Sequence, residues 1–463
     1  MLKQQHARFV TSTLIEQSRG MVGQDGGQPW FLFWNTQSLE LLGLENFKLD
    51  LDVKKRCISY LEQCHNAETG GFRGAPHLMS HVASSYAAVM AIVNISNEQA
   101  YNIVDIPKMK QYLMRVKNNF KVDPESSNMF GYLSPTEQSK IDDNDPSKYI
   151  GTIPGSMAIH ENGEMDIRGV YCSLVCADIL GILEDNKEFT DGVGDFLLGC
   201  QTYEGGFSCS PFGEAHGGYT FCALASFLIL SRIGDKSYEQ INFDKLAEWL
   251  SNRQLAELGG FNGRINKLID SCYSYWVGAS FELMDILSQK QGSEMNIDGE
   301  WLFNQEALQG YLIICCQGVQ GGLRDKPTKN PDIYHTCYSL SGMSVSQSKS
   351  NFKGLFADDH TIDHADYTGI PVPRVIDFED FPEGNPSTVE AQENGEDPKI
   401  DDEIQTNTNE QNPADHSVLI SDIYSNALLR MNPIYNGRFD KVHKAREFFK
   451  VKVEKLKKEG LLS

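Results

Sequence analysis

Apolar residues recur at helical spacing in many short segments of this chain, and strand-like alternation is hardly present. Residues three and four positions apart share one face of a helix, so this period predicts amphipathic helices. The segments with this period are 34–43, 54–64, 84–95, 106–118, 168–182, 191–200, 219–233, 242–253, 273–287, 304–316, 333–345 and 441–457. The pattern therefore predicts an all-α fold.

A Gly-rich pattern separates many of these segments. Its copies are Gln63…Gly70-Gly71-Phe72, Gln201…Gly205-Gly206-Phe207, Gln254…Gly259-Gly260-Phe261 and Gln317…Gly321-Gly322-Leu323, and a degenerate copy is expected at Met129-Phe130-Gly131-Tyr132. Each unit is predicted to be a pair of helices joined by the Gly-rich turn. Such hairpins must stack to bury their apolar faces, either as an open solenoid or as a closed ring.

The net charge of −22 is concentrated in one stretch of the chain. Between Asp377 and Asp415 there are thirteen acidic residues and a single basic one, Lys399, which is a net charge of −12, together with four prolines. This composition predicts a disordered acidic insert at about 374–416, within a single domain that spans 1–463. The negative charge argues against nucleic-acid binding.

The eleven cysteines lie mostly in apolar stretches such as 311–316. An odd number of thiols in such positions is typical of reduced cysteines in the cytosol. The N-terminal segment has no apolar signal core, and no run of about 18 apolar residues occurs in the sequence. We therefore expect a soluble cytoplasmic protein without stable membrane insertion.

Cationic and polar residues follow the Gly-rich turns. His216, Arg264, Lys267 and Tyr273 all follow such turns, and Arg168 occupies the equivalent place in another unit. The second helix of each pair begins there, so the helix N-termini should gather at one end of the stack, where their N–H groups favour an anion. These residues could bind a phosphate together, or each could belong to an unrelated surface ion pair.

Asp270, Cys272 and the distant His335 form a sparse candidate metal site. A carboxylate, a thiolate and an imidazole suit zinc, and three protein ligands leave one position open, as in catalytic zinc sites. Asp270 and Cys272 would point about 200° apart inside a helix, so they could share a metal only at a helix entrance. Otherwise Asp270 is a plain N-cap and Cys272 a small buried apolar residue.

Aromatic residues lie beside the same turns, namely Trp30, Trp34, Tyr86, Tyr171, Tyr219, Trp276 and Tyr334. Each one alone is more typical of a core residue than of a ligand contact. Together they would form an apolar cavity with a cationic mouth beside a metal.

Two stretches carry a resemblance to a known family. They are Gly263-Arg264-Ile265-Asn266-Lys267-Leu268-Ile269-Asp270-Ser271-Cys272-Tyr273-Ser274-Tyr275-Trp276 and Tyr334-His335-Thr336-Cys337-Tyr338. They closely resemble the β subunits of protein prenyltransferases, in particular the farnesyl-transferring members, and the match runs from Pro29 to about Val345 and weakly over 432–436. The resemblance implies an α/α barrel (toroid) of about six helical hairpins, in a heterodimer with a separate helical α subunit.

The resemblance also implies a role for each candidate residue. It makes Asp270, Cys272 and His335 the zinc ligands and Asp325 a magnesium ligand. The diphosphate contacts would be His216, Arg264, Lys267 and Tyr273, the isoprenoid contacts Arg168, Tyr171, Trp276, Tyr219 and Tyr86, and the peptide contacts Trp30, Trp34, His81 and Tyr334. One departure from the family pattern is Thr328, which stands where glycine usually follows Asp325-Lys326-Pro327.

The implied reaction is zinc-dependent transfer of a farnesyl group from farnesyl diphosphate to the cysteine of a C-terminal CaaX motif, in proteins such as small GTPases. Three alternatives differ in what they require. A geranylgeranyltransferase β subunit is disfavoured by Trp30 and Asp325, and a terpene cyclase would need an Asp-x-Asp-Asp motif that the sequence lacks. A non-catalytic toroid used as a scaffold would need none of the metal ligands.

Overall fold

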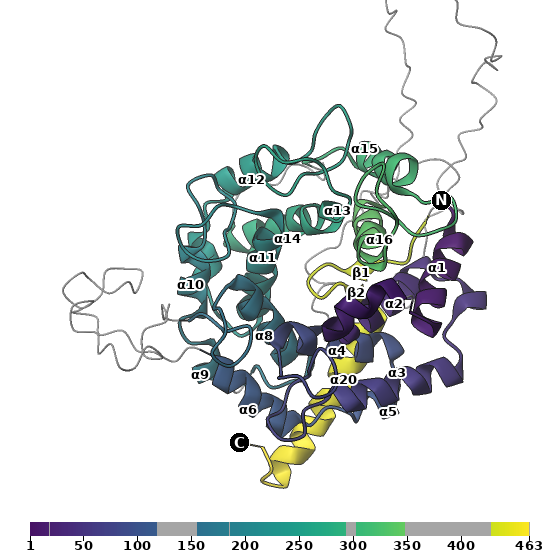
Figure 1. Cartoon of the computed structure of the whole chain (residues 1–463). Coiled ribbons are helices and arrows are strands. Elements are labelled where there is room, and N and C mark those ends of the chain that lie inside the picture. The colour runs from purple at the N-terminus through teal and green to yellow at the C-terminus, as the bar shows by residue number, and fades with distance from the viewer. Residues whose placement is uncertain (18, 118–154, 185, 293–301, 348–426, 463) are drawn as a thin grey trace, which may run out of the picture.

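Six inner helical segments form a closed ring in the part of the chain that the structure describes (Figure 1). This computed structural model describes residues 1–463 except 18, 118–154, 185, 293–301, 348–426 and 463. The inner segments are α2 (Gln28–Leu42), α4 (Val82–Ile95), α8 (Ile167–Ile179), α11 (Gly217–Arg232), α13 with α14 (Tyr273–Trp276 and Gly278–Gln291) and α16 (Ile333–Gln347). Each packs against the next, and α16 packs against α2, so the stack closes on itself.

A second set of helices surrounds this ring. It consists of α1 (Lys3–Ile15), α3 (Leu51–Cys64), α6 (Ile106–Val116), α10 (Val193–Gly199), α12 (Phe243–Ser251) and α15 (Gln305–Gly310), which continues as the π-helix η5 (Tyr311–Cys316). Short elements connect them: η1 (Arg19–Gly27), η2 (Glu45–Phe47), α5 (Glu98–Tyr101), α9 (Lys187–Thr190) and η4 (Ser237–Gln240). The predicted all-α barrel of helical hairpins is confirmed, and the open solenoid is wrong.

An isolated antiparallel bridge links the end of the outer helix to the start of the inner segment in five units. It pairs His65 with Phe72, Lys117 with Met157, Gln201 with Phe207, Gln254 with Phe261, and Gln317 with Leu323. In the first copy His65 rather than Gln63 pairs with Phe72, and in the unit of the degenerate copy Met157 occupies the apolar place. The segment expected to hold that copy, 129–132, lies outside the described residues.

Glycine in these turns allows close contact with the neighbouring outer helix. Gly205 and Gly321 have φ angles of 108° and 107°, a region that side chains with a Cβ atom rarely adopt. A Cβ atom at Gly205 would also clash with the carbonyl oxygen of Lys245 in α12, and one at Gly321 with that of Gln5 in α1. The last turn thus packs on the first helix in the same way as an internal turn packs on the next unit.

A polar contact repeats the same arrangement at the seam of the ring. Gln201 and Gln254 accept hydrogen bonds from the backbone N–H groups of Asn242 and Asn304, the N-caps of α12 and α15, at 3.1 and 2.8 Å. Gln317 accepts one from the N–H of Leu2, the N-cap of α1, at 2.7 Å. Helix α1 therefore completes the outer ring, although its sequence did not predict a helix. Its buried face consists of only His6, Ala7 and Val10.

Every inner helix after α2 begins at a fixed distance from its turn. The capping side chains are His81, Asp166, His216, Asp270 and Asp332, which follow Phe72, Met157, Phe207, Phe261 and Leu323 by nine residues. Five residues after the same apolar positions, the backbone is left-handed at His77, Asn162, Phe212, Asn266 and Thr328. The φ of 75° at Thr328 explains why glycine would be favourable there.

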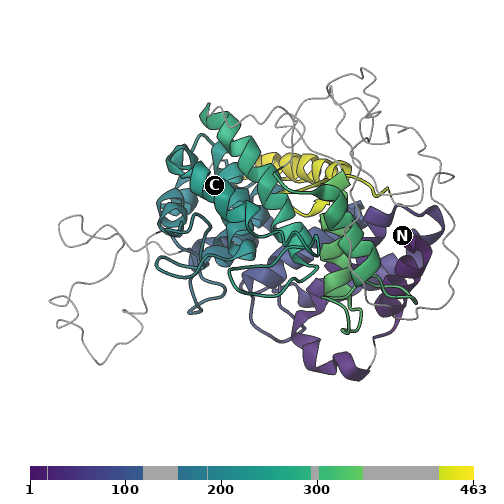
Figure 2. The same ribbon diagram turned by 90° about the horizontal axis from the view of Figure 1, so that it is seen from above.

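The end of the chain closes one side of the ring. The short strands β1 (Met431–Asn432) and β2 (Gly437–Arg438) pair inside the ring of inner helices, and α20 (Phe439–Lys458) packs across α4, α5 and α8 (Figures 1 and 2). Residues 431–436 are almost completely buried. No helix among the described residues is both long and apolar enough to cross a membrane.

The predicted helices all correspond to observed ones, but some boundaries differ. Helix α2 begins at Gln28 rather than at residue 34, and the segment predicted at 273–287 is divided at Val277 into α13 and α14. The acidic insert at about 374–416 lies outside the described residues.

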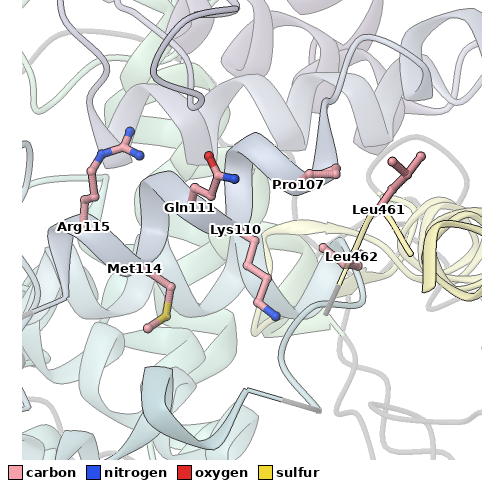
Figure 3. Close-up of a pocket in the computed structure, with 7 residues that line it drawn as sticks. All are labelled: Pro107, Lys110, Gln111, Met114, Arg115, Leu461 and Leu462. Atoms are coloured by element: carbon pink, nitrogen blue, oxygen red, sulfur yellow. The ribbon is translucent and has the colours of Figure 1, made fainter. Parts of the chain in front are cut away.

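A shallow groove of about 400 Å³ lies on the outer wall of the barrel (Figure 3). Pro107, Lys110, Gln111, Met114 and Arg115 of α6 line one side of it, and Leu461 and Leu462, which follow α20, line the other. None of the candidate site residues contributes to this groove.

Candidate active site

The three candidate metal ligands lie at the entrances of two neighbouring inner helices. Asp270 precedes α13 and accepts a hydrogen bond from the backbone N–H of Cys272 at 2.9 Å, while His335 lies in the first turn of α16. A carboxylate oxygen, the Sγ atom and a ring nitrogen of the three residues all lie within 4.8 Å of one another. The helix entrance lets Asp270 and Cys272 converge, as the spacing argument required.

A second carboxylate orients the imidazole of His335. The Nδ1 atom lies 2.6 Å from Oδ2 of Asp332, and the Nε2 atom lies 3.2 Å from Oδ1 of Asp270. Burial alone would lower the pKa of His335, but the hydrogen bonds to Asp270 and Asp332 outweigh it and raise the pKa to about 9. A histidine that donates a hydrogen bond from Nδ1–H to a carboxylate presents Nε2 to a metal, and such a carboxylate commonly supports zinc-binding histidines.

The pKa values of Asp270 and Cys272 depend on burial and on the interaction between the two side chains. Burial raises the pKa of the Cys272 thiol well above its ordinary value, and the nearby Asp270 carboxylate raises it further. For Asp270, the hydrogen bonds from His335 and the Cys272 amide outweigh the effect of burial, so its pKa lies below the ordinary value. The donor set, its convergence and its supporting carboxylate therefore fit a zinc ion.

Asp325 is tied to the segment that carries the metal ligands. Its backbone carbonyl accepts hydrogen bonds from the N–H of Ser271 at 2.9 Å and from the hydroxyl of Tyr311 in η5 at 3.4 Å. Both of its carboxylate oxygens lie 2.5 Å from Nζ of Lys326, and its side chain is mostly buried. The residue predicted to bind magnesium thus lies in the loop next to Asp270.

His216 and Tyr273 form one unit at the entrances of α11 and α13. The N–H of Gly218 donates to Nδ1 of His216 at 3.1 Å, so a neutral ring carries its proton on Nε2, which lies 3.0 Å from the Tyr273 hydroxyl. Burial and the charge of Arg264 lower the pKa of His216, which favours that neutral ring. Burial raises the pKa of Tyr273 and keeps its hydroxyl protonated. The Tyr273 hydroxyl therefore accepts from His216 and keeps its own proton to donate.

The two basic candidates near this unit differ in their surroundings. Arg264 is close enough to lower the pKa of His216, and it forms an ion pair with Glu214. The side chain of Lys267 is exposed. The structure therefore brings His216, Arg264 and Tyr273 together, and it leaves Lys267 on the surface of the same turn.

Aromatic rings form a continuous belt around the inner wall, and we call this set the aromatic belt. Its members are Trp30, Tyr86, Tyr171, Phe221, Trp276, Tyr338, Tyr334 and Trp34, and each ring lies 4.5–5.6 Å, centroid to centroid, from the next, with Trp34 returning to Trp30. Trp30, Trp34, Trp276 and Tyr334 keep part of their surface exposed although they belong to inner helices. Trp276 donates from Nε1 to the Tyr334 hydroxyl at 3.3 Å, next to His335. The belt thus reaches the metal ligands.

Comparison with known proteins gives the family of this chain. Residues 1–436 match the model of the prenyltransferase alpha-alpha toroid domain. The protein farnesyltransferase subunit beta of Schizosaccharomyces pombe is 36% identical over 342 residues, which cover 74% of this chain and 77% of that protein. The chain belongs to the family of protein farnesyltransferase β subunits.

Other members of this family and one solved structure agree with that placement. The subunits named protein farnesyltransferase beta from Saccharomyces cerevisiae and Pyricularia oryzae are 38% and 32% identical, over 71% and 75% of this chain. The matched part spans 64% and 63% of those two proteins, which is less than two thirds of their length. The structure of Candida albicans protein geranylgeranyltransferase-I complexed with GGPP has a TM-score of 0.55 at 21% identity, covers 76% of this chain and 94% of its own, and shows the same fold.

Three of the residues that the family resemblance made isoprenoid or peptide contacts lie outside the aromatic belt. Tyr219 packs on the ring of His216 at 5.1 Å and beneath the guanidinium of Arg168 at 6.0 Å. Arg168 is held by Asp166, the N-cap of α8. His81 caps α4, and its ring lies 5.8 Å from that of His160. All three are at helix entrances, on the side of the metal ligands.

Asp332, Phe221 and Tyr338 also belong to the site, although they were not predicted from the sequence. Asp332 has a signal in hindsight, because it occupies the capping position nine residues after Leu323, as Asp270 does after Phe261. Phe221 and Tyr338 complete the aromatic belt, and Phe221 lies two residues from the predicted Tyr219, about 200° further around the helix. Only the fold shows which of these two residues faces the inner wall.

Proposed function

We propose that the chain is the β subunit of a protein farnesyltransferase. It would transfer the farnesyl group of farnesyl diphosphate to the cysteine thiol of a C-terminal CaaX motif, in substrates such as small GTPases. The observation that carries this proposal is the position of Asp270, Cys272 and His335, at helix entrances between the His216–Tyr273 unit and the aromatic belt. The metal bound by these ligands would contact a thiol, the His216–Tyr273 unit a diphosphate, and the aromatic belt an apolar chain.

Asp270, Cys272 and His335 would hold zinc. Asp332 would accept a hydrogen bond from Nδ1–H of His335, so that Nε2 faces the metal. A free thiol has a pKa of about 8.5, and coordination at the open position of zinc would hold the substrate cysteine as its thiolate. The surrounding residues then only have to place the lipid against that sulfur.

The leaving diphosphate would be stabilised by the groups around His216. As the new sulfur–carbon bond forms, the carbon–oxygen bond of the diphosphate breaks and its electron pair goes to the leaving oxygen. The Tyr273 hydroxyl, which already accepts from His216, can donate its proton in a hydrogen bond to that oxygen. Arg264 and Lys267 add positive charge beside it. Donors fixed before the reaction stabilise developing charge without having to reorganise.

The farnesyl chain would lie along the aromatic belt. Contact with the partly exposed surfaces of Trp30, Trp34, Trp276 and Tyr334 would bury apolar area at about 25 cal/mol per Å². Tyr171 and Tyr86 would contribute the deeper wall, with Arg168, Tyr219 and His81 at the entrance. Trp30, Trp34, His81 and Tyr334 would also contact the peptide.

A helical α subunit would complete the enzyme, as the names of the relatives, which are those of β subunits, imply. The cytosol is the compartment that suits the chain, because all eleven of its cysteines are free thiols, most of them buried.

The test is an assay of the purified heterodimer with farnesyl and geranylgeranyl diphosphates and peptides that do or do not end in a CaaX motif. We expect farnesyl transfer to the CaaX cysteine. A geranylgeranyltransferase remains the second candidate, because the Arabidopsis thaliana type-1 subunit beta is 35% identical over 42% of this chain. Preferential use of the twenty-carbon lipid would replace the proposal by that alternative, and transfer of neither would refute both.

The proposed role of Asp325 predicts a change in magnesium dependence. Magnesium prefers carboxylate and phosphate oxygens, so Asp325 would bring the ion to the diphosphate once Lys326 releases it. Asp325→Lys should supply the positive charge covalently and make the farnesyl-transfer rate nearly independent of magnesium. Asp325→Asn, which has the same shape but no charge, should keep a low rate at every magnesium concentration. An unchanged magnesium titration in both variants would contradict the role.

A further inference from the structure

A segment before the last helix lies inside the ring of inner helices and contacts residues of the aromatic belt. Residues 431–438, which we call the C-terminal plug, include strands β1 and β2 and lie at the centre of the ring in Figure 1. Ile434, Tyr435 and Asn436 have no exposed surface. The plug contacts α2, α4 and α16, so it is held by inner helices on several sides.

Three tyrosine hydroxyls from different inner helices bind the backbone of this plug. Tyr86 of α4 donates to the carbonyl of Tyr435 at 3.1 Å, Tyr171 of α8 to that of Ile434 at 2.8 Å, and Tyr275 of α13 to that of Pro433 at 2.9 Å. The three tyrosines occupy the same place in their units, fourteen residues after Phe72, Met157 and Phe261. These are successive carbonyls of the plug.

The rings of the same tyrosines belong to the wall around the proposed lipid site. Tyr86 and Tyr171 are members of the aromatic belt, and the Tyr275 ring lies 5.0 and 5.1 Å from those of Phe221 and Trp276. The orientation of each ring is therefore coupled to the position of the plug backbone. A shift of the plug would move the floor and the wall of the belt together.

A buried ionic cluster fixes the plug from the side away from the belt. The hydroxyl of Tyr435 donates to the carboxylate of Asp178 in α8, which also pairs with Arg232 of α11. Arg446 of α20 lies 3.8 Å from the same carboxylate. The side chain of Asp178 is 3% exposed, so these partners have almost no competition from water. Buried charged hydrogen bonds of this kind are short, directional and costly to displace.

We propose that Tyr435, held by Asp178 and Arg232, sets the depth of the aromatic belt and thereby selects the length of the prenyl chain. Tyr435 is a positioning residue, because it acts through the plug backbone and the hydroxyls of Tyr86, Tyr171 and Tyr275 rather than by touching substrate. Farnesyl and geranylgeranyl diphosphates have the same charged head and differ by one isoprene unit, so the apolar end of the site must discriminate between them. This inference rests on the proposed prenyl-transfer function.

The test compares Tyr435→Phe with the wild-type heterodimer. This change removes one hydroxyl and keeps the ring. The readout is the ratio of kcat/KM for geranylgeranyl diphosphate to that for farnesyl diphosphate with one CaaX peptide, because a general loss of folded enzyme cancels in the ratio. We expect the ratio to rise roughly fivefold, about the effect of losing one hydrogen bond. Amide hydrogen exchange of residues 427–438 should become faster in the same variant.

Tyr101→Phe is the matched control. Tyr101 is also buried, its ring packs on Phe448 and Phe449 of α20, and its hydroxyl lies 3.2 Å from that of Ser96, on the outer side of the barrel. The lipid ratio should not change in this variant. If Tyr435→Phe does not fold, Tyr275→Phe tests the same coupling from the wall, by removing the bond to the Pro433 carbonyl.

The possible outcomes are distinct. A wild-type enzyme that transfers neither lipid would contradict the proposed function, whatever the plug does. A wild-type enzyme that transfers farnesyl, with folded Tyr435→Phe and Tyr275→Phe variants that keep its lipid ratio, would overturn the inference about the plug. An equal rise of the ratio in Tyr101→Phe would also overturn it, because the effect would then not depend on the plug.

Discussion

Replacing Cys272 by alanine is expected to remove bound zinc and to lower farnesyl transfer by at least roughly a hundredfold, because a catalytic metal contributes several kcal/mol. The loss follows from the geometry of the site. Cys272 lies within 4.8 Å of both other candidate ligands, and three ligands are the minimum of a catalytic zinc site. Two remaining ligands would hold the metal weakly. Zinc content per heterodimer, measured by elemental analysis, should fall together with turnover.

The control for this experiment is another buried free cysteine. Cys57 in α3 is 4% exposed and belongs to the outer ring, so Cys57→Ala removes a similar side chain without touching the site. It should retain zinc and turnover. Full zinc occupancy in Cys272→Ala would exclude the residue as a ligand. Loss of zinc with unchanged turnover would show that the metal takes no part in the reaction.

The convergence of Asp270 and Cys272 at a helix entrance could be predicted from the local sequence alone. The two-residue spacing of Asp270 and Cys272 excludes a mid-helix site, and the apolar period that follows them places a helix start there. The approach of His335 could not be derived in the same way. It depends on how tightly two successive hairpins stack, and the close contact of Gly259 with Ala307 of α15, rather than local propensity, contributes to that distance. Only the family resemblance supplied it.

Other parts of the fold could not be predicted from the spacing of apolar residues, for physical reasons. Helix α1 fully buries only His6, Ala7 and Val10, with Phe9 and Leu14 partly buried beside them, and its packing on the last turn stabilises it. Met157 occupies the place of the aromatic residue in its turn, so this copy of the repeat cannot be recognised from its sequence. The hydroxyls of Tyr86 and Tyr171 bind a segment more than two hundred residues away, and no local pattern encodes such a contact.

The sequence alone does not show which aromatic residues of an inner helix face the inside of the ring. Positions two residues apart have different surroundings, so Tyr219 lies near His216 whereas Phe221 lies in the aromatic belt. A helix that is apolar nearly all round gives no amphipathic direction from which to choose. The ring closure itself decides which side faces inward.

Replacing Arg232, the positive partner of Asp178, is expected to lower the free energy of unfolding more than any other substitution proposed for this protein. Arg232→Met would leave the carboxylate buried between α8 and the C-terminal plug, with Arg446 at 3.8 Å as its remaining cation. Breaking a buried ion pair from one side typically costs about 3–5 kcal/mol, because the remaining charge loses its compensation. The free energy of unfolding can be compared from urea midpoints, provided that the slopes agree. Arg115→Met, at the exposed pair with Glu161, should cost about 1 kcal/mol or less.

The pH dependence of Arg232→Met distinguishes this electrostatic cause from lost packing. Burial already raises the pKa of Asp178 in the wild type, although Arg232 and Tyr435 act against it, and loss of Arg232 would raise it further. A carboxyl whose pKa is higher in the folded state binds more protons there than in the unfolded chain, so the stability it affects increases as the pH falls. The deficit of Arg232→Met relative to the wild type should therefore shrink between pH 7.5 and pH 5.5. A deficit that is constant over this range would mean that Arg232 acts through packing of its side chain rather than through its charge.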